Sequence, residues 1–201
     1  DSLKNTFVPP GPDTCLVNGN EIRKDGSKTS IYEGLLCTRV GFGKKPSAYH
    51  GRKFALIKKV LMGHEFPWFY QQLINSSHTK KDKNCYFTHV FFNTTVGYSN
   101  FYDLVKPVVD RLDLKAPIRI KANLYPHTKK IEIHKSHSDT IYPSKAAIFY
   151  INTNNGSTIL EDGKKIESIE NRLLLFDGHK PHQSTSCTNA KVRININFNF
   201  F

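Results

Sequence analysis

Three residues in the second half of the chain have the types and the order expected of a mononuclear metal site. His137 and Asp139 are two residues apart, so both side chains point to the same side if the segment is extended. His182 follows a later apolar segment and comes directly after Pro181. Two imidazoles and one carboxylate on one face form a facial triad, which suits Fe(II) and leaves coordination positions open. We therefore predict that His137, Asp139 and His182 bind the metal and are the catalytic residues.

A guanidinium follows this set in the last segment of the chain. Arg193 can bind a carboxylate with two parallel hydrogen bonds. Two other histidines are alternatives for the metal, because His134 precedes His137 by three residues and His179 precedes His182 by three. The order of H-x-D, a β-type region, a histidine and then an arginine in the final strand is more specific than any of its members alone.

The first half of the chain must contribute the elements that pack behind the strands carrying these residues. Residues 1–50 are rich in Pro, Gly and Asn turn formers, which predicts a loop-rich N-terminal arm of unknown role. Apolar residues then have helical spacing in Phe54–Met62 and again in Trp68–Ile74. Tyr86–Phe92 is typical of a strand.

A further helix is predicted at Asn100–Leu112. Ser99 or Asn100 is its expected N-cap, and Pro107 is expected to disturb it. No apolar run approaches the ~18 residues that a membrane-spanning helix needs.

From residue 118 onward the segments become short, β-branched and alternating. Turn residues separate them, as in Asn154-Asn155-Gly156 and Asp177-Gly178. Many short strands at near-regular spacing are typical of a sandwich or jelly roll. The predicted strands are Ile118–Tyr125, Ile131–His137, Ala146–Asn152, Ser157–Leu160, Leu173–Phe176 and Lys191–Phe201. The fold class is therefore α+β, mainly β, with the N-terminal helices packed on one sheet.

In two of the predicted strands, apolar and polar residues alternate so that one face is apolar and the other polar. In the last strand, Ile194 and Ile196 share one face while Arg193 and Asn195 share the other. Ile118–Tyr125 alternates in the same way. We expect the apolar faces to pack against the helices and the polar faces to line a cleft, which places the site inside the roll.

Composition limits the class of protein. The chain has 201 residues and a formal net charge of +12, enough for one sizeable domain. The basic excess suggests an acidic partner such as nucleic acid, although the cations are spread along the chain. Four scattered cysteines favour reduced thiols in a cytoplasmic protein, and a Cys15–Cys37 disulfide is the alternative.

Over roughly residues 121–201 the chain resembles the prolyl-hydroxylase-like branch of the 2-oxoglutarate/Fe(II) dioxygenases. Its helical part, including EFPWFY at Glu65–Tyr70, is similar to small members of this family from marine phages and bacteria. The matching stretches are KANLYP (Lys121–Pro126), HSD (His137–Asp139), AIFYIN (Ala147–Asn152), NRLLLFDGHKPHQ (Asn171–Gln183) and KVRININF (Lys191–Phe198).

The resemblance implies a double-stranded β-helix, or jelly roll, in residues 51–201, with helices in 54–112 and the β-roll in 118–201. It assigns the metal to His137, Asp139 and His182, and the C5 carboxylate of 2-oxoglutarate to Arg193. The other residues expected to bind this cosubstrate are Tyr150, Tyr125, Asn123 and Asn195. Ordinary sheet positions are the alternative for the two tyrosines. Asn195 departs from many relatives, which have a small hydroxyl residue there.

The implied reaction uses Fe(II), 2-oxoglutarate and O₂, hydroxylates a C–H bond and releases succinate and CO₂. The expected substrate is a protein or peptide side chain, admitted by loops at Thr79–Asn84 and residues 140–146. A nucleic acid base or a small molecule is the alternative substrate. A non-enzymatic β-roll binding module is the alternative function. The oligomeric state is left unassigned.

Overall fold

The computed structural model describes residues 53–72, 85–95, 97–114 and 116–201 in full. Before residue 53 it describes only the backbone of one helix and four strands. Three of these strands, β1 (Thr14–Val17), β2 (Asn20–Arg23) and β3 (Lys28–Ser30), form a small antiparallel sheet of their own. The division at residue 50 stays a prediction. The backbone on either side of it is one helix, α1 (Ala48–Leu61).

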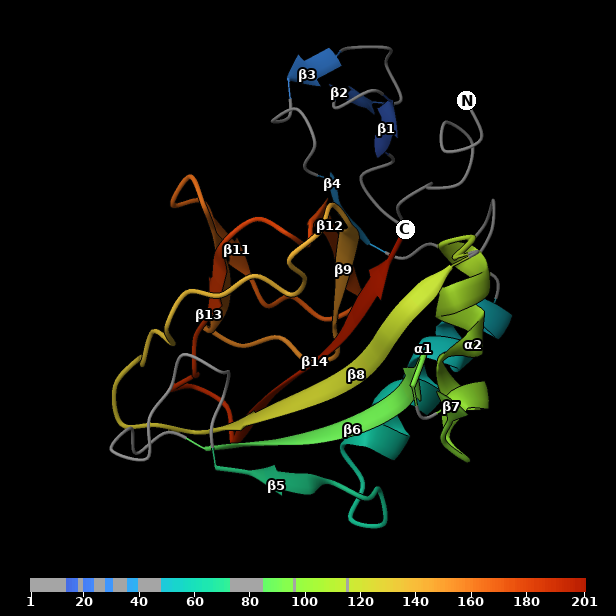
Figure 1. The fold of residues 1–201 in the computed structure, drawn as a ribbon, viewed down its shortest axis with the longest axis vertical. Coiled ribbons are helices and arrows are strands. Elements are labelled where there is room, and N and C mark those ends of the chain that lie inside the picture. Colours follow the sequence, from blue (N-terminus) through green and yellow to red (C-terminus); the bar gives the residue numbers. More distant parts are fainter. Residues whose placement is uncertain are drawn as a thin grey trace.

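An eight-stranded antiparallel sheet is the largest unit of the fold (Figure 1). Its long central strands are β8 (Pro117–Pro126) and β14 (Val192–Phe200). The strand order is β4 (Leu36–Arg39), β12 (Arg172–Asp177), β9 (Lys145–Tyr150), β14, β8, β6 (Tyr86–Asn93) and β5 (Phe69–Gln71), with β7 (Gly97–Tyr98) paired to β6. Strands from both ends of the sequence thus meet in one layer.

Helices α1 and α2 (Tyr102–Arg111) cover one face of this sheet (Figure 1). The main core lies between them. It joins Ile57 and Leu61 of α1 and Val105, Val108 and Val109 of α2 to the apolar face of the sheet. The apolar residues of the last strand, Ile194, Ile196 and Phe198, are fully buried there, as their alternation predicts. The polar faces of β8 and β14 consequently point the other way.

A second, three-stranded sheet closes the roll over that polar face. It consists of β11 (Lys165–Glu167), β10 (Ser157–Leu160) and β13 (His182–Ser184). A smaller apolar cluster, which includes Ile148, Leu174, Phe176 and Ile166, joins it to the large sheet. The predicted class, α+β and mainly β with helices packed on one sheet of a jelly roll, is confirmed.

Two predicted segments are wrong in type. Trp68–Ile74 is not helical where it is described. Its centre forms the edge strand β5, which pairs with β6 because the aromatic Phe69 and Tyr70 suit a strand and Pro67 stands before them. Ile131–His137 is not a regular strand either. Its pairing consists of isolated bridges and single hydrogen bonds rather than a ladder, and Ile131 and Ile133 stay exposed.

The second helix begins two residues later than the sequence predicts. Its N-cap is Phe101, and no side chain caps it. Ser99 still contributes, because its Oγ accepts a hydrogen bond from the Phe101 N–H at 3.1 Å. The helix continues through Pro107, where the sequence predicts a disturbance.

Of the four cysteines, Cys85 and Cys187 are described and both are free thiols. The alternative Cys15–Cys37 disulfide and the loop Thr79–Asn84 lie outside the described side chains. In the part of the chain that is described, no helix has the length and apolarity that crossing a membrane requires.

Candidate functional site

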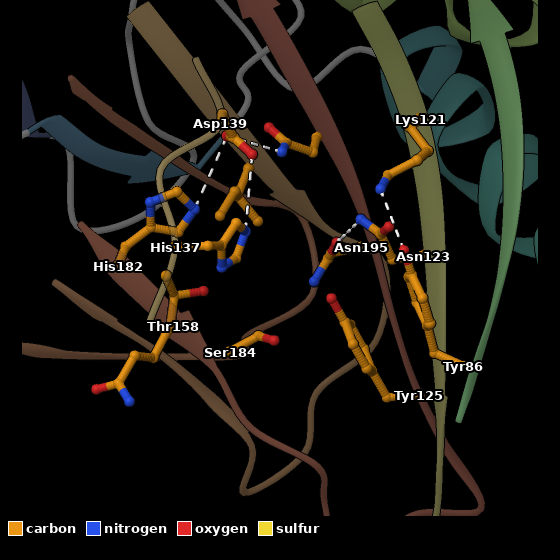
Figure 2. Close-up of a pocket in the computed structure, with 13 residues that line it drawn as sticks. Tyr86, Lys121, Asn123, Tyr125, His137, Asp139, Thr158, His182, Ser184 and Asn195 are labelled. Atoms are coloured by element: carbon orange, nitrogen blue, oxygen red, sulfur yellow. Dashed lines mark hydrogen bonds and ion pairs between the residues drawn. The ribbon is translucent and has the colours of Figure 1, made fainter. Parts of the chain in front are cut away.

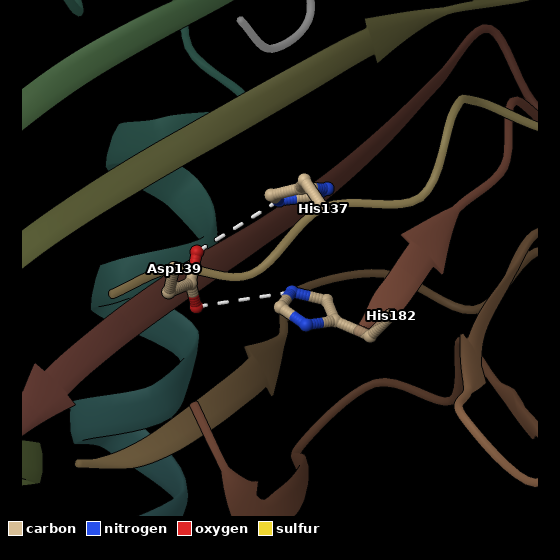
Figure 3. A group of neighbouring side chains, drawn as sticks. All are labelled: His137, Asp139 and His182. Carbon is tan, nitrogen blue, oxygen red and sulfur yellow. Dashed lines mark ion pairs between the residues drawn. The ribbon is translucent and has the colours of Figure 1, made fainter. Parts of the chain in front are cut away.

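The structure brings His137, Asp139 and His182 together (Figure 3). Their donor atoms all lie within 4.8 Å of one another. Nε2 of His137 is 3.8 Å from Oδ1 of Asp139, and Nε2 of His182 is 3.8 Å from Oδ2. The two alternative histidines are not members of this cluster, and Nδ1 of His134 lies 2.7 Å from Ser184 Oγ instead.

A cross-chain pairing explains why residues far apart in sequence converge. His137 and His182 form an antiparallel bridge, in which each backbone N–H donates to the other's carbonyl at 3.0 and 2.9 Å. The backbone N–H of Asp139 donates to the carbonyl of Gly178 at 2.9 Å. Three backbone bonds between the H-x-D segment and the Gly178–His182 segment therefore hold the three side chains at one point.

The imidazoles are oriented for metal binding. Nδ1 of His182 lies 3.1 Å from the carbonyl of Lys180, which can only accept, so this nitrogen carries the proton. The lone pair is then on Nε2, the atom that faces Asp139. Burial, with a contribution from the neighbouring His182, lowers the pKa of His137 to about 4. His137 is therefore neutral near pH 7 and able to act as a ligand.

The carboxylate of Asp139 is held from the large sheet. Its Oδ2 accepts hydrogen bonds from Nδ2 of Asn197 at 3.0 Å and Nδ2 of Asn199 at 2.8 Å, both on β14. Burial alone would raise the pKa of Asp139. His182, Asn197, His137 and Asn199 together outweigh burial and hold the pKa below its usual range. Asp139 is thus an ionised, fixed ligand whose side chain is only 3% exposed.

A pocket inside the roll opens onto this cluster (Figure 2). Polar side chains of β8 and β14 form one wall, and residues of β10 and β13 form the other. Three of the predicted cosubstrate residues, Asn123, Tyr125 and Asn195, line it. Asn123 donates from Nδ2 to Oδ1 of Asn195 at 3.0 Å. The predicted polar cleft inside the roll is therefore present.

Arg193 lies deeper, behind Tyr125, and is completely buried. Its guanidinium carbon is 5.2 Å from the ring centre of Tyr125 and 5.9 Å from that of Tyr150. It donates to Ser168 Oγ at 2.7 Å, to the Thr185 carbonyl at 3.2 Å and to Thr158 Oγ1 at 3.3 Å. All of these acceptors are neutral.

Among the described residues, no Asp or Glu forms an ion pair with Arg193. A buried cation without an anion is costly, so a site that retains one is suited to an anionic ligand. Tyr150 helps to fix the surroundings of Arg193, because its hydroxyl donates at 2.8 Å to Thr158 Oγ1, which also accepts from the guanidinium. Burial raises the pKa of Tyr125, although the nearby Arg193 opposes this, so Tyr125 stays a neutral donor near pH 7.

Several residues of the site carry no assignment from the sequence. Asn197 and Asn199 are recognisable there only as members of the polar face, and nothing in their spacing points to Asp139. Lys121 lines the pocket and Arg119 approaches Asp139 at 3.6 Å, both on the inward face of β8. Ser168 directly follows β11, and Thr158 lies in β10, the central strand of the smaller sheet. Nothing in the sequence points from either residue to Arg193.

The donor set fits a divalent first-row cation. Two imidazoles and one ionised carboxylate could provide three ligands on one side, and the pocket lies on the other. The pocket and the buried guanidinium behind it fit a ligand with a carboxylate at its far end.

Comparison with known proteins identifies the fold but not a sequence family. No family model matches, and no curated protein matches significantly. Solved structures do match over most of the chain. The fold is that of the 2OG-Fe(II) oxygenases. The resemblance predicted from the sequence is confirmed at this level.

Three of these structures show the extent of the likeness. A prolyl hydroxylase from Trichoplax adhaerens, in complex with a hypoxia inducible factor peptide fragment, has a TM-score of 0.58 and 15% identity and covers 84% of this chain and 83% of its own. A 2OG-Fe(II) oxygenase family oxidoreductase from Burkholderia pseudomallei has a TM-score of 0.55 and 9% identity, and the match covers 83% of this chain and 84% of its own. A Pseudomonas putida prolyl-4-hydroxylase has a TM-score of 0.51 and 14% identity, and the match covers 83% of this chain and 91% of its own.

Proposed function

We propose that this chain is an Fe(II)- and 2-oxoglutarate-dependent dioxygenase that hydroxylates a C–H bond of a protein or peptide side chain. One observation carries the proposal. A His-His-Asp cluster and a buried guanidinium without a described anionic partner belong to the same roll, with a polar pocket between them. The oxygenase fold supports it.

His137, Asp139 and His182 would hold Fe(II), and Arg193 would bind the C5 carboxylate of 2-oxoglutarate. The bound iron, with 2-oxoglutarate and O₂, supplies the oxidising chemistry and yields succinate and CO₂ as by-products. The protein itself would orient the cosubstrate and shield the reaction from water. Arg193 supplies the charge, and Tyr150 and Thr158 fix the guanidinium in place. Tyr125, Asn123 and Asn195 line the pocket in which the rest of the cosubstrate would lie.

A peptide substrate is supported by a groove beside the metal ligands. It has a volume of about 410 Å³ and runs past Asp139 along Ser138–Tyr142, part of the loop expected to admit substrate. Hydroxyl groups line it and could bond a peptide backbone, chiefly from Thr94, Thr95 and Thr140. The Trichoplax structure, which contains a peptide fragment, makes such a substrate a reasonable choice. A cytoplasmic location is part of the proposal, because both described cysteines are free thiols.

Metal binding and 2-oxoglutarate turnover test the proposal together. We expect one Fe(II) or Mn(II) per chain by calorimetry, and succinate formation that depends on Fe(II) and O₂. His137→Ala should weaken metal binding by more than the ~10–100-fold that loss of an outer partner causes. Arg193→Met should weaken 2-oxoglutarate binding by ~10–100-fold while metal binding persists, since a charge-assisted hydrogen bond contributes ~1.5–3 kcal/mol.

His64→Ala is the matched control, because the side chain of His64 is 94% exposed. It should change neither measurement. A purified, folded protein that binds no metal and consumes no 2-oxoglutarate would contradict the proposal and favour a binding module.

A further inference from the structure

Two cations on the inward face of β8, Lys121 in the pocket and Arg119 in the groove, remain unused by the proposed reaction. The inward residues of β8 and β14 pair in register, with Tyr125 opposite Arg193 at the deep end and Asn123 opposite Asn195. Lys121 opposite Asn197 and Arg119 opposite Asn199 follow towards the groove. Lys121 and Arg119 thus lie at the level of Asp139, beyond the far-carboxylate site at Arg193.

The charge around the metal cluster is not balanced by the described residues. Asp139 is the one carboxylate lining the pocket that contains Lys121, and also the one lining the groove that contains Arg119. A divalent cation would be neutralised in part by Asp139, and the C5 carboxylate of 2-oxoglutarate would pair with Arg193. Lys121 and Arg119 would then have no anion, which is unfavourable for cations that are partly withdrawn from water.

The surroundings of Lys121 are poor for an ammonium group. Its Nζ donates to the Tyr86 hydroxyl at a long 3.4 Å and lies 5.5 Å from the Tyr86 ring centre (Figure 2). No described carboxylate lies within ion-pair distance of it. Burial, followed by the neighbouring Arg119, lowers the pKa of Lys121 to about 8.

Arg119 has spare donors on the groove side. Among the described residues, only its Nη2 is engaged, by Oδ1 of Asn199 at 3.2 Å and by Asp139 Oδ1 at 3.6 Å. Its side chain is 32% exposed, so a ligand in the groove can reach it. Asn197 adds an acceptor, because its buried Oδ1 has no partner while its Nδ2 is committed to Asp139.

We propose that Lys121 and Arg119 bind a carboxylate of the substrate, which is an acidic side chain of a peptide lying in the groove. This inference rests on the proposed function and names its substrate class. The two cations would place the acidic residue beside the metal. The orphaned oxygen of Asn197 would accept an N–H of the peptide. A free small carboxylic acid has the same chemistry and is the alternative source.

Binding to matched peptides tests the inference without turnover. The full chain is loaded with Zn(II) and 2-oxoglutarate, and binding is measured by calorimetry. The probes are a twelve-residue Gly-Ser peptide with two central aspartates, the same peptide with two asparagines, and N-acetyl-aspartate. We expect the aspartate peptide to bind at least ~10-fold more tightly than the asparagine peptide, the factor that ~1.4 kcal/mol provides.

Variants show which residues cause the preference for the aspartate peptide. Lys121→Gln and Arg119→Gln should each reduce it by on the order of tenfold, and Lys121→Arg should retain it, as expected for charge-assisted hydrogen bonds. Lys106→Gln is the control, because Lys106 is exposed on α2 and pairs with Asp110 at 2.8 Å. Melting curves confirm that each variant is folded.

The outcomes separate the two proposals. Equal binding of the two peptides, or a preference that survives in both Gln variants, overturns the inference. A loss of 2-oxoglutarate affinity in Lys121→Gln with peptide binding intact also overturns it. Tighter binding of N-acetyl-aspartate than of the peptide supports the carboxylate site with a free acid as its source. An aspartate preference in a protein that binds neither metal nor 2-oxoglutarate supports the site while the proposed function fails.

Discussion

The two oxygens of Asp139 have different surroundings, which assigns them different roles. Oδ2 accepts two short amide hydrogen bonds, from Asn197 and Asn199. In the described part of the chain, Oδ1 has only the longer approaches of Arg119 at 3.6 Å and His137 at 3.8 Å. A carboxylate oxygen that already has two donors is a weaker ligand for a metal. Oδ1 is therefore the oxygen that we expect to bind the cation, with Asn197 and Asn199 as positioning residues.

Replacing either asparagine should loosen this carboxylate. We expect Asn199→Leu to reduce metal affinity by ~10–100-fold, the effect typical of partners that orient a ligand. Asn199 is 1% exposed and leucine keeps its branching at Cγ, so the fold should persist, which a melting curve checks. Calorimetric titration with Mn(II) measures the change. Asn155→Ala is the control, since Asn155 bonds to Asn189 and Thr188 outside the pocket. Unchanged affinity in both Asn197→Leu and Asn199→Leu would contradict the assignment.

The sequence predicts the proposed metal ligands better than the residues that hold those ligands in place. His137, Asp139 and His182 are recognisable because metal chemistry restricts their types and spacing. The choice between His182 and His179 is open in the sequence, and the backbone bridge to His137 brings His182 into the cluster. The roles of Asn197 and Lys121 depend on which residues face them across strands, and that register is not written in either strand alone.

Elements are predicted well where burial imposes a period. The two-residue alternation of β8 and β14 follows from having helices on one face and a polar pocket on the other. Trp68–Ile74 fails because seven residues with three aromatics fit either period, and pairing with β6 decides the outcome. Ile131–His137 fails because, among the described residues, it has backbone partners on one side alone, in the segment 182–186, and these form isolated bridges rather than a ladder.

One turn between elements restricts the cosubstrate site. Gly156 precedes β10 and passes over Arg193. A Cβ there would lie 2.6 Å from Cδ of Arg193 and 2.6 Å from the Ser186 carbonyl. Gly156→Ala should therefore lower the free energy of unfolding by ~1–3 kcal/mol, as overpacking does. It should also weaken 2-oxoglutarate binding, because the Arg193 side chain must move. Thermal melting and calorimetry measure the two effects.

Gly163 provides the matched control for this turn. It has φ +80°, and a Cβ added there would meet nothing within 4 Å, so Gly163→Ala should cost ~1–2 kcal/mol of backbone strain only. Its 2-oxoglutarate affinity should equal that of the unchanged protein. A Gly156→Ala protein that loses stability but keeps full 2-oxoglutarate affinity would show that the close approach does not position Arg193.

At the scale of the whole molecule, the described cations differ in whether a carboxylate neutralises them. Exposed Lys106 and Lys145 have carboxylate neighbours at 2.8 and 2.6 Å, so they add nothing to the excess charge. Lys121 in the pocket, Arg119 in the groove and the buried Arg193 lie instead on the inward faces of β8 and β14. The net charge of +12 alone suggests nucleic acid, but the inward cations favour a few carboxylates over a long phosphate backbone.

Salt dependence distinguishes these two partners. Binding of single-stranded DNA falls with salt at a logarithmic slope of ~−0.7 per phosphate neutralised. If only Arg119 and Lys121 reach an oligothymidine, the slope should be no steeper than ~−1.4, and binding should be weak at physiological salt. Fluorescence anisotropy of a labelled oligothymidine at several NaCl concentrations measures it. A slope of ~−4 or steeper that becomes shallower by ~0.7 in Lys121→Gln would favour a nucleic acid substrate, because it would mean that about six phosphates are neutralised and that Lys121 binds one of them.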